Sequence, residues 1–163
     1  RNRLRLLMTH LAGMRIGEVV AVRVSDVVAE DMKPKTEIRL SASQTKGKRA
    51  RTVFVSTRLQ REITKYLKAS NTLYSERALF RTQKSHAFTA NTATQLLQRI
   101  YARAGIVGAT SHSGRRSYLT KLADKGVSVF VLAQLAGHQH ISTTQRYVSV
   151  SDTQLRNAAE LAS

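Results

Sequence analysis

Residues 111–148 read SHSGRRSYLTKLADKGVSVFVLAQLAGHQHISTTQRYV, and this stretch decides the fold. Its apolar residues recur at the three- and four-residue spacing of a helix, first before Gly126 and again before Gly137. Both glycines predict helix ends, and Ser128 predicts the cap of the second helix. The segment is therefore predicted to consist of short helices joined by tight turns.

Four side chains of the same stretch are candidates for a reaction site. His112 and Arg115 stand three residues apart, so on a helix they share a face and can meet one phosphate. Tyr147 follows His138 by nine residues, on a further helix for which Ser142 predicts the cap. Taken singly, each has a plainer interpretation: a surface histidine, a solvated arginine, a histidine that ends a helix, and a core tyrosine.

The first twenty residues predict two helices that meet at Arg15. One apolar helical face consists of Leu4, Leu7, Met8 and Leu11. Gly13 is a typical left-handed end for this helix, and a second short helix carries Ile16, Val19 and Val20. Arg15 then lies at the bend, where a long side chain can reach into a cleft. Its alternative role is electrostatic capping of a helix C-terminus.

Residues 25–56 change from helical to strand character. Three short strands are predicted, at Val27–Val28, Ile38–Leu40 and Val53–Val55. The segment EIRLSASQ, the basic tip TKGKRA (45–50) and RTVFVS predict a hairpin. We expect Gly47 to supply the unusual backbone angle of its turn.

Beyond residue 57 the pattern is helical to the end. One face contains Leu59, Ile63, Tyr66 and Leu67, and another contains Ala93, Leu96, Leu97, Ile100 and Ala104. Thr89 and Ser151 predict caps, and Gly105 predicts a stop. The expected fold is α+β and mainly α-helical, with a small three-stranded antiparallel sheet at one edge. A chain of 163 residues, 1–163, is expected to form a single domain.

The charge is the strongest clue in the composition. There are 27 Lys and Arg against 10 Asp and Glu, a net charge of +17, which favours a polyanionic partner over a merely soluble surface. Without cysteine the chain can form neither a disulfide nor a thiolate metal site. It has no apolar run long enough for a membrane and no signal peptide at its start, so we expect a cytoplasmic, nucleoid-associated protein with no membrane partner. The missing initiator Met favours a fragment of a longer protein.

In combination, five motifs resemble the catalytic domain of the tyrosine recombinases, the phage integrase family. They are GMRIGE (13–18), TKGKRAR (45–51), SHSGRR (111–116), LAGH (135–138) and TTQRYV (143–148). Their order, their spacing and the flanking apolar pattern agree with the family over about residues 3–150. The joint occurrence makes the plainer interpretation of each residue improbable.

The resemblance implies a site and a reaction. The catalytic set is Arg15, Lys46, His112, Arg115, His138 and Tyr147. Tyr147 would attack a DNA phosphate and form a 3′-phosphotyrosine, and Lys46 rather than Lys48 would be the general acid. Glu18 is expected either to orient an arginine or to pack structurally. Neither a metal nor a cofactor is implied.

The partners implied are double-stranded DNA, further copies of the chain in a tetrameric synapse, and an accessory directionality factor. We expect the family's N-terminal core-binding DNA domain to be absent from this fragment. The terminal SDTQLRNAAELAS is expected to form a helix whose apolar face is Leu155, Ala158, Ala159 and Ala162. This helix would dock on a neighbouring protomer or, equally, within its own chain.

One departure from the family pattern concerns Gly114, where the family usually has Leu. Arg116 and Ser117 also replace a usual His and Thr. We expect Gly114 to remove an apolar contact and weaken local packing. Three other functions compete with a recombinase: a type IB topoisomerase-like strand transferase, a catalytically silent DNA-binding module, and a metal-dependent nuclease. The nuclease would need clustered carboxylates that the ten acidic residues do not offer.

Overall fold

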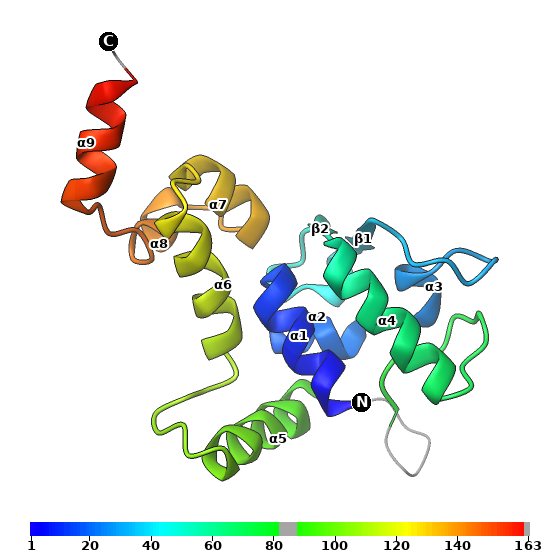
Figure 1. Cartoon of the computed structure of the whole chain (residues 1–163). Helices are drawn as coiled ribbons and strands as arrows, with labels where there is room; N and C mark the ends of the chain where they lie inside the picture. The colour runs from blue at the N-terminus through cyan, green and yellow to red at the C-terminus, as the bar shows by residue number, and fades with distance from the viewer. Residues whose placement is uncertain (82–87, 162–163) are drawn as a thin grey trace. The chain divides into compact units, whose positions relative to one another are not determined.

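The computed structural model describes residues 1–81 and 88–161, and Figure 1 labels its elements along the chain. In chain order they are α1 (Asn2–Ala12), α2 (Ile16–Ala21), α3 (Val24–Val27), β1 (Glu37–Leu40), the short 3-10 helix η1 (Ala42–Gln44), β2 (Arg51–Phe54), α4 (Thr57–Ala69), α5 (Ala90–Arg103), α6 (Ser113–Asp124), α7 (Val129–Ala136), α8 (Ile141–Gln145) and α9 (Asp152–Glu160). The predicted mainly helical α+β class is confirmed. Over the described ranges, every helix is too short or too polar to cross a lipid bilayer.

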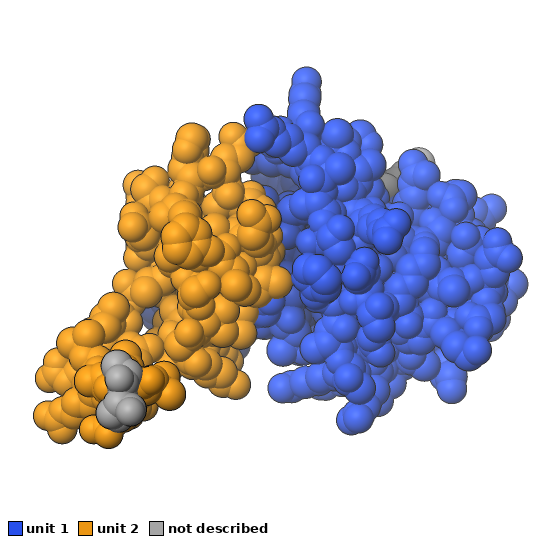
Figure 2. All heavy atoms as spheres, turned by 90° about the horizontal axis from the view of Figure 1, so that it is seen from above, with its two compact units in different colours: residues 1–118 blue, residues 119–163 orange. Residues whose placement is uncertain are grey.

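The chain divides into two compact units, residues 1–118 and residues 119–163 (Figure 2). The first unit contains α1 to α5 and the strand pair. The second contains α7 to α9, and the boundary falls within α6.

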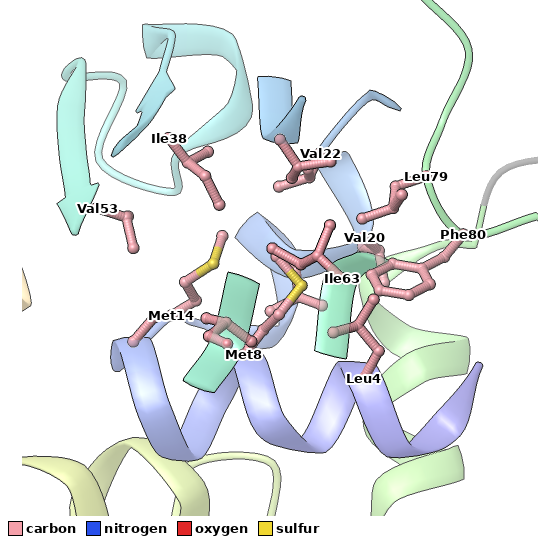
Figure 3. Packing of buried hydrophobic residues seen from close by; sticks show 14 of the residues in the cluster. Leu4, Met8, Met14, Val20, Val22, Ile38, Val53, Ile63, Leu79 and Phe80 are labelled. Carbon is pink, nitrogen blue, oxygen red and sulfur yellow. The ribbon is translucent and has the colours of Figure 1, made fainter. Parts of the chain in front are cut away.

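The core of the first unit is built around two methionines. Met8 on α1 and Met14 just beyond it are both fully buried. In Figure 3 Met8 lies beside Ile63, and Met14 extends toward Ile38 and Val53. Helix α1 packs against α4, and α2 packs against α5. The apolar faces predicted for these helices therefore meet in one core.

Gly13 ends α1 as predicted, with a φ of 61° that L-residues with side chains rarely adopt. The position is also crowded, because a Cβ on Gly13 would lie 2.6 Å from a ring carbon of Tyr118. The chain turns here and starts α2 with Arg15 as its N-cap. The predicted placement of Arg15 at the bend between two helices is confirmed.

The strands β1 and β2 form an antiparallel pair in which Ile38 lies opposite Val53. Both side chains are buried against the core, which confirms the predicted hairpin. The sheet of the described residues has two strands, so the predicted third strand is wrong.

The segment predicted as the third strand forms a helical turn instead. Val27 is the last residue of α3, and Val28 makes only an isolated bridge to Pro34. The cause is Asp26, whose Oδ2 accepts the backbone N–H of Arg23 at 2.8 Å and so caps the start of α3. This local hydrogen bond outweighs the strand preference of two adjacent valines.

Two further local predictions are wrong. The left-handed residue in the hairpin turn is Lys48, with φ 49°, and Gly47 has no positive φ. Residues 70–81 are not helical. Part of this segment pairs with the chain after α2, where Leu79 donates its N–H to the carbonyl of Val22 at 2.8 Å.

Gly114, in the first turn of α6, lies where this helix meets α1 at very short range. A Cβ at this position would lie 2.1 Å from Oγ1 of Thr9 and 2.9 Å from Cδ2 of His10. Thr9 is fully buried and donates its hydroxyl to the carbonyl of Leu6, so it has little room to move. The expectation that Gly114 weakens packing is therefore wrong, because the glycine is what permits the close approach.

We expect Gly114→Ala to lower the free energy of unfolding by about 2 kcal/mol, because overpacking outweighs the better helix propensity of alanine. The matched control is Gly17→Ala in α2, where a new Cβ would meet only Ala90 at an ordinary 3.7 Å. That variant should be neutral or more stable by up to about 1 kcal/mol. Urea unfolding of both variants measures the difference, and equal effects would contradict the close approach.

In the second unit, α7 has the predicted boundaries. Ser128 Oγ accepts the N–H of Val131 at 3.3 Å, and Gly137 ends the helix with φ 62°. The next helix differs from the prediction. The N-cap of α8 is His140, not Ser142, and α8 ends at Gln145. Tyr147 therefore lies in the turn after the helix and not on it.

The last helix, α9, starts after Ser151, which accepts the N–H of Gln154 as predicted. Gln154 also donates to the carbonyl of Ala123 at 3.2 Å. Leu155 is 59% exposed, and Ala158 and Ala159 are exposed as well. Ala162, predicted on the same apolar face, lies outside the described residues.

Candidate active site

Arg15 is held at the start of α2 by a buried carboxylate. Glu18 Oε2 accepts the backbone N–H of Arg15 at 2.8 Å, and Oε1 accepts its Nη1 at 3.0 Å. The carboxylate has a second arginine partner, Arg51 on β2, which donates from Nε at 3.1 Å and from Nη2 at 2.7 Å. The Glu18 side chain is only 1% exposed. One carboxylate thus joins the start of α2 to the hairpin.

Glu18 keeps its charge despite its burial. Burial by itself raises the pKa of the Glu18 carboxyl, but the hydrogen bonds and charge of Arg51, with those of Arg15, outweigh it and leave the pKa below its ordinary value. A buried carboxylate of this kind needs both partners, because removing one leaves uncompensated charge in the core. Of the two roles expected for Glu18, its contacts with Arg15 and Arg51 fit the orientation of an arginine, and its burial fits structural packing.

Arg115 approaches the same bend from α6. Its Nη1 donates to the carbonyl of Gly13 at 2.6 Å, and the residue is only 4% exposed. Gly13 precedes Arg15 by two residues, so the structure brings these two predicted arginines to one turn of the chain. His112 lies just before α6, and its side chain is exposed while that of Arg115 is buried.

Lys46 lies in the turn of the hairpin with its side chain exposed. The turn itself is braced by Thr45, whose Oγ1 donates to the carbonyl of Arg49 at 2.8 Å and accepts its N–H at 3.1 Å. At its base, Gln44 donates to the carbonyl of Ala21 at 2.9 Å and thereby ties the hairpin to the end of α2. The lysine is therefore presented by a braced turn beside the helix that Arg15 starts.

The two remaining predicted residues meet in the second unit. The rings of His138 and Tyr147 stack with centroids 6.2 Å apart. Thr144 positions both: its Oγ1 lies 2.8 Å from Nδ1 of His138, and its carbonyl accepts the N–H of Tyr147 at 2.9 Å. Thr144 is fully buried, so this support is rigid. A half-buried phenol beside an imidazole is an arrangement suited to nucleophilic attack on a phosphate.

The site residues thus fall into two groups. The first unit contains Arg15, Lys46, His112, Arg115 and Glu18, and the second contains His138 and Tyr147. Among residues 1–81 and 88–161, no three His, Asp or Glu side chains gather as a metal site would require. The polar groups available to a phosphate are guanidinium, ammonium and imidazole groups, which can donate several hydrogen bonds to its oxygens.

Sequence reasoning missed two members of the site, Arg51 and Thr144. A signal for Arg51 was present, because on a strand it alternates in step with the apolar Val53 and Val55 and so must face inward. An inward arginine requires a buried acid. For Thr144 the sequence offers only its place three residues before Tyr147.

Comparisons with known proteins relate the chain to a family and a fold. The model of the phage integrase family matches residues 1–154. Tyrosine recombinase XerA of Pyrococcus horikoshii is 30% identical over 166 residues, which cover 99% of this chain and 55% of that protein. Transposase A from transposon Tn554 of Staphylococcus aureus is 31% identical over 170 residues, covering 96% of the chain and 46% of the transposase. The chain spans about half the length of these relatives.

Among solved structures, XerH site-specific recombinase bound to its difH substrate in a pre-cleavage complex resembles the chain with a TM-score of 0.72. The two are 23% identical, and the match covers 98% of this chain and 46% of the recombinase. At this identity the likeness establishes the fold, in agreement with the helix order described above.

Proposed function

The chain belongs to the phage integrase family, the tyrosine recombinases, and from this membership we propose that it cuts and rejoins double-stranded DNA at specific sites. We further propose that its two units act as one catalytic domain of a longer recombinase. The observation that carries the proposal is the stacking of Tyr147 against His138 on a buried Thr144. The DNA-bound XerH structure, which shares the fold, supports DNA as the substrate.

The proposed reaction needs no water and no external energy. Tyr147 Oη bonds to phosphorus, the bond from phosphorus to the 5′ oxygen breaks, and the protein stays attached as a 3′-phosphotyrosine. His112 accepts the phenol proton, and Lys46 gives a proton to the departing 5′ oxygen. A 5′ hydroxyl of another strand then attacks the phosphotyrosine, which reverses the chemistry and completes the exchange.

Negative charge develops on the non-bridging oxygens of the phosphate in the transition state. Arg15, Arg115 and His138 stabilise this charge. A guanidinium is always protonated at working pH and offers paired donors to two oxygens. Glu18 fixes Arg15, and the carbonyl of Gly13 fixes Arg115, so both cations are preorganised before DNA arrives. Preorganised donors of this kind contribute most when they need not rearrange during the reaction.

A denaturing gel separates the recombinase from the competing functions. In EDTA the protein should still form a covalent adduct with a nicked duplex, because arginines and not a metal ion face the phosphate. A silent binding module would give no adduct. A metal-dependent nuclease would cut only with Mg²⁺ and would leave no protein on the DNA. A topoisomerase-like enzyme would form the adduct but reseal the same strand, without exchange between two labelled duplexes.

We also propose that α9 joins one copy of the chain to another in a tetrameric synapse. The apolar residues of α9 are exposed. The largest of these residues is Leu155, which is 59% exposed. Leu155→Asp should weaken assembly on DNA, as measured by native gel or light scattering. Thr153→Asp, on the other side of the same helix, is the matched control and should assemble normally. Normal assembly of Leu155→Asp would mean that α9 packs within its own chain.

A further inference from the structure

We propose that Arg51 is a positioning residue of the active site, which acts through Glu18 to fix the catalytic Arg15. The inference rests on the proposed function, since it assigns a role within that reaction. Arg51 would not touch the DNA phosphate itself. Its effect would be to hold the carboxylate, and with it the guanidinium that does.

The hydrogen bonds of Glu18 divide evenly between two arginines. Oε1 accepts Nη1 of Arg15 at 3.0 Å and Nε of Arg51 at 3.1 Å. Oε2 accepts the backbone N–H of Arg15 at 2.8 Å and Nη2 of Arg51 at 2.7 Å. Each oxygen therefore has one donor from α2 and one from β2. Because a carboxylate that accepts two hydrogen bonds at each oxygen has little rotational freedom, both residues set its orientation.

The two arginines use their donors differently. Arg51 commits Nε and Nη2 to the carboxylate, and its side chain is only 10% exposed. Arg15 commits only Nη1 of its guanidinium, and 29% of its side chain is exposed. The partly exposed side chain of Arg15 is the one suited to meet a phosphate, whereas the buried fork of Arg51 is directed at Glu18. The geometry therefore assigns phosphate binding to Arg15 and the support of Glu18 to Arg51.

The position of Arg51 in the chain also links Glu18 to the hairpin that carries Lys46. It is the first residue of β2, directly after the turn that carries Lys46. The carboxylate of Glu18 thus connects the hairpin of the general acid to the helix of the phosphate-binding arginine. A change at Arg51 should disturb the placement of Arg15 without altering the net charge available to bind DNA by more than one.

The first test replaces Arg51 with Met, which keeps the length of the side chain and removes its donors. Single-turnover cleavage of a suicide duplex at saturating DNA should slow by about 30-fold, because small displacements of a catalytic group carry large costs in rate. The dissociation constant for DNA should change less than about 3-fold. The matched control is Arg39→Met on β1, whose side chain is 86% exposed, and it should cleave at the wild-type rate.

The second test asks whether Arg51 acts through Glu18. Arg51→Met should slow cleavage by the wild-type protein. It should not slow cleavage further in a Glu18→Gln protein, because the contact between Arg51 and the Glu18 carboxylate is already lost there. If Arg51 binds DNA directly, the two effects multiply and the DNA affinity falls in both backgrounds. That result would overturn the inference. Arg51→Lys, which restores charge without the fork, should recover only part of the rate.

The third test is a pH profile, which a purely structural role would not change. Without Arg51, burial of Glu18 meets less compensation, so the carboxylate takes up a proton at higher pH and releases Arg15. The rate of Arg51→Met relative to wild type should therefore fall further as the pH is lowered from about 8 to about 5. The other groups of the protein are the same in both variants, so their effects cancel in the ratio. A constant ratio would contradict the positioning role.

These measurements also separate the inference from the proposed function. If wild type and Arg39→Met both form no covalent adduct with any duplex tried, the proposed function has failed. If both form the adduct and folded Arg51→Met, judged by its melting curve, forms it at the wild-type rate, the inference alone has failed.

Discussion

Tyr147→Phe should abolish the covalent protein–DNA adduct while leaving the fold and the DNA affinity unchanged. The substitution deletes only Oη, and the ring that stacks on His138 at 6.2 Å remains. Without that oxygen no bond to phosphorus can form, so the loss of the adduct should be complete and not merely large. A denaturing gel with an end-labelled suicide duplex measures the adduct, and a filter-binding titration measures the affinity.

The matched control is Tyr74→Phe, which removes the same atom from an exposed tyrosine in the first unit. This variant should form the adduct at the wild-type rate. If Tyr147→Phe still became attached to DNA, another residue would be the nucleophile. Peptide mapping of the adduct would then identify it, with Tyr118 in α6 as the first candidate.

The second large effect separates protonation of the leaving group from charge stabilisation. Lys46→Ala should slow cleavage of ordinary DNA by about 10²–10⁴-fold, because the 5′ oxygen would leave as an alkoxide. A substrate with sulfur at that bridging position needs no proton, since a thiolate leaves readily. The variant should recover most of its cleavage on the sulfur substrate, as single-turnover rates on both DNAs would measure.

Arg115→Ala is the matched comparison for this experiment. Its guanidinium is expected to stabilise the non-bridging oxygens, so it should lose about 10²–10³-fold in rate on both substrates. A Lys46→Ala protein that is equally slow on both would place Lys46 among the DNA-backbone contacts. Lys48, the left-handed residue of the same turn, would then be tested first as the acid.

The parts of the fold that could be predicted are those decided by neighbouring residues. Gly13 and Gly137 end their helices in the left-handed conformation, and Ser128 and Ser151 cap theirs, as their local chemistry requires. The errors arose where another contact decided the outcome. Val27 joined a helical turn because Asp26 capped it.

Gly114 shows what the sequence cannot express. The effect of this glycine on packing depends on side chains of α1, more than a hundred residues earlier in the chain. A single sequence does not show that these two segments come into contact. The candidate site shows the same division. Motif order alone predicts six residues and Glu18, whereas Thr144 and Arg51 are recognised from the residues that they contact. Of these two, only Arg51 could have been recognised from the sequence, because it shares the strand alternation of the buried Val53 and Val55.

The close approach of Gly114 to Thr9 also constrains how this sequence can change over time. A larger residue at position 114 becomes tolerable only after the side chain at position 9 has been removed or displaced and that of His10 has shifted. The new Cβ would otherwise lie 2.1 Å from Oγ1 and 2.8 Å from Cβ of Thr9, and 2.9 Å from Cδ2 of His10. The order of the two substitutions therefore matters, and one path between the same end points passes through a destabilised intermediate. Positions 9 and 114 are epistatic, so an α1 or α6 taken from a relative would have to be transplanted together with its partner.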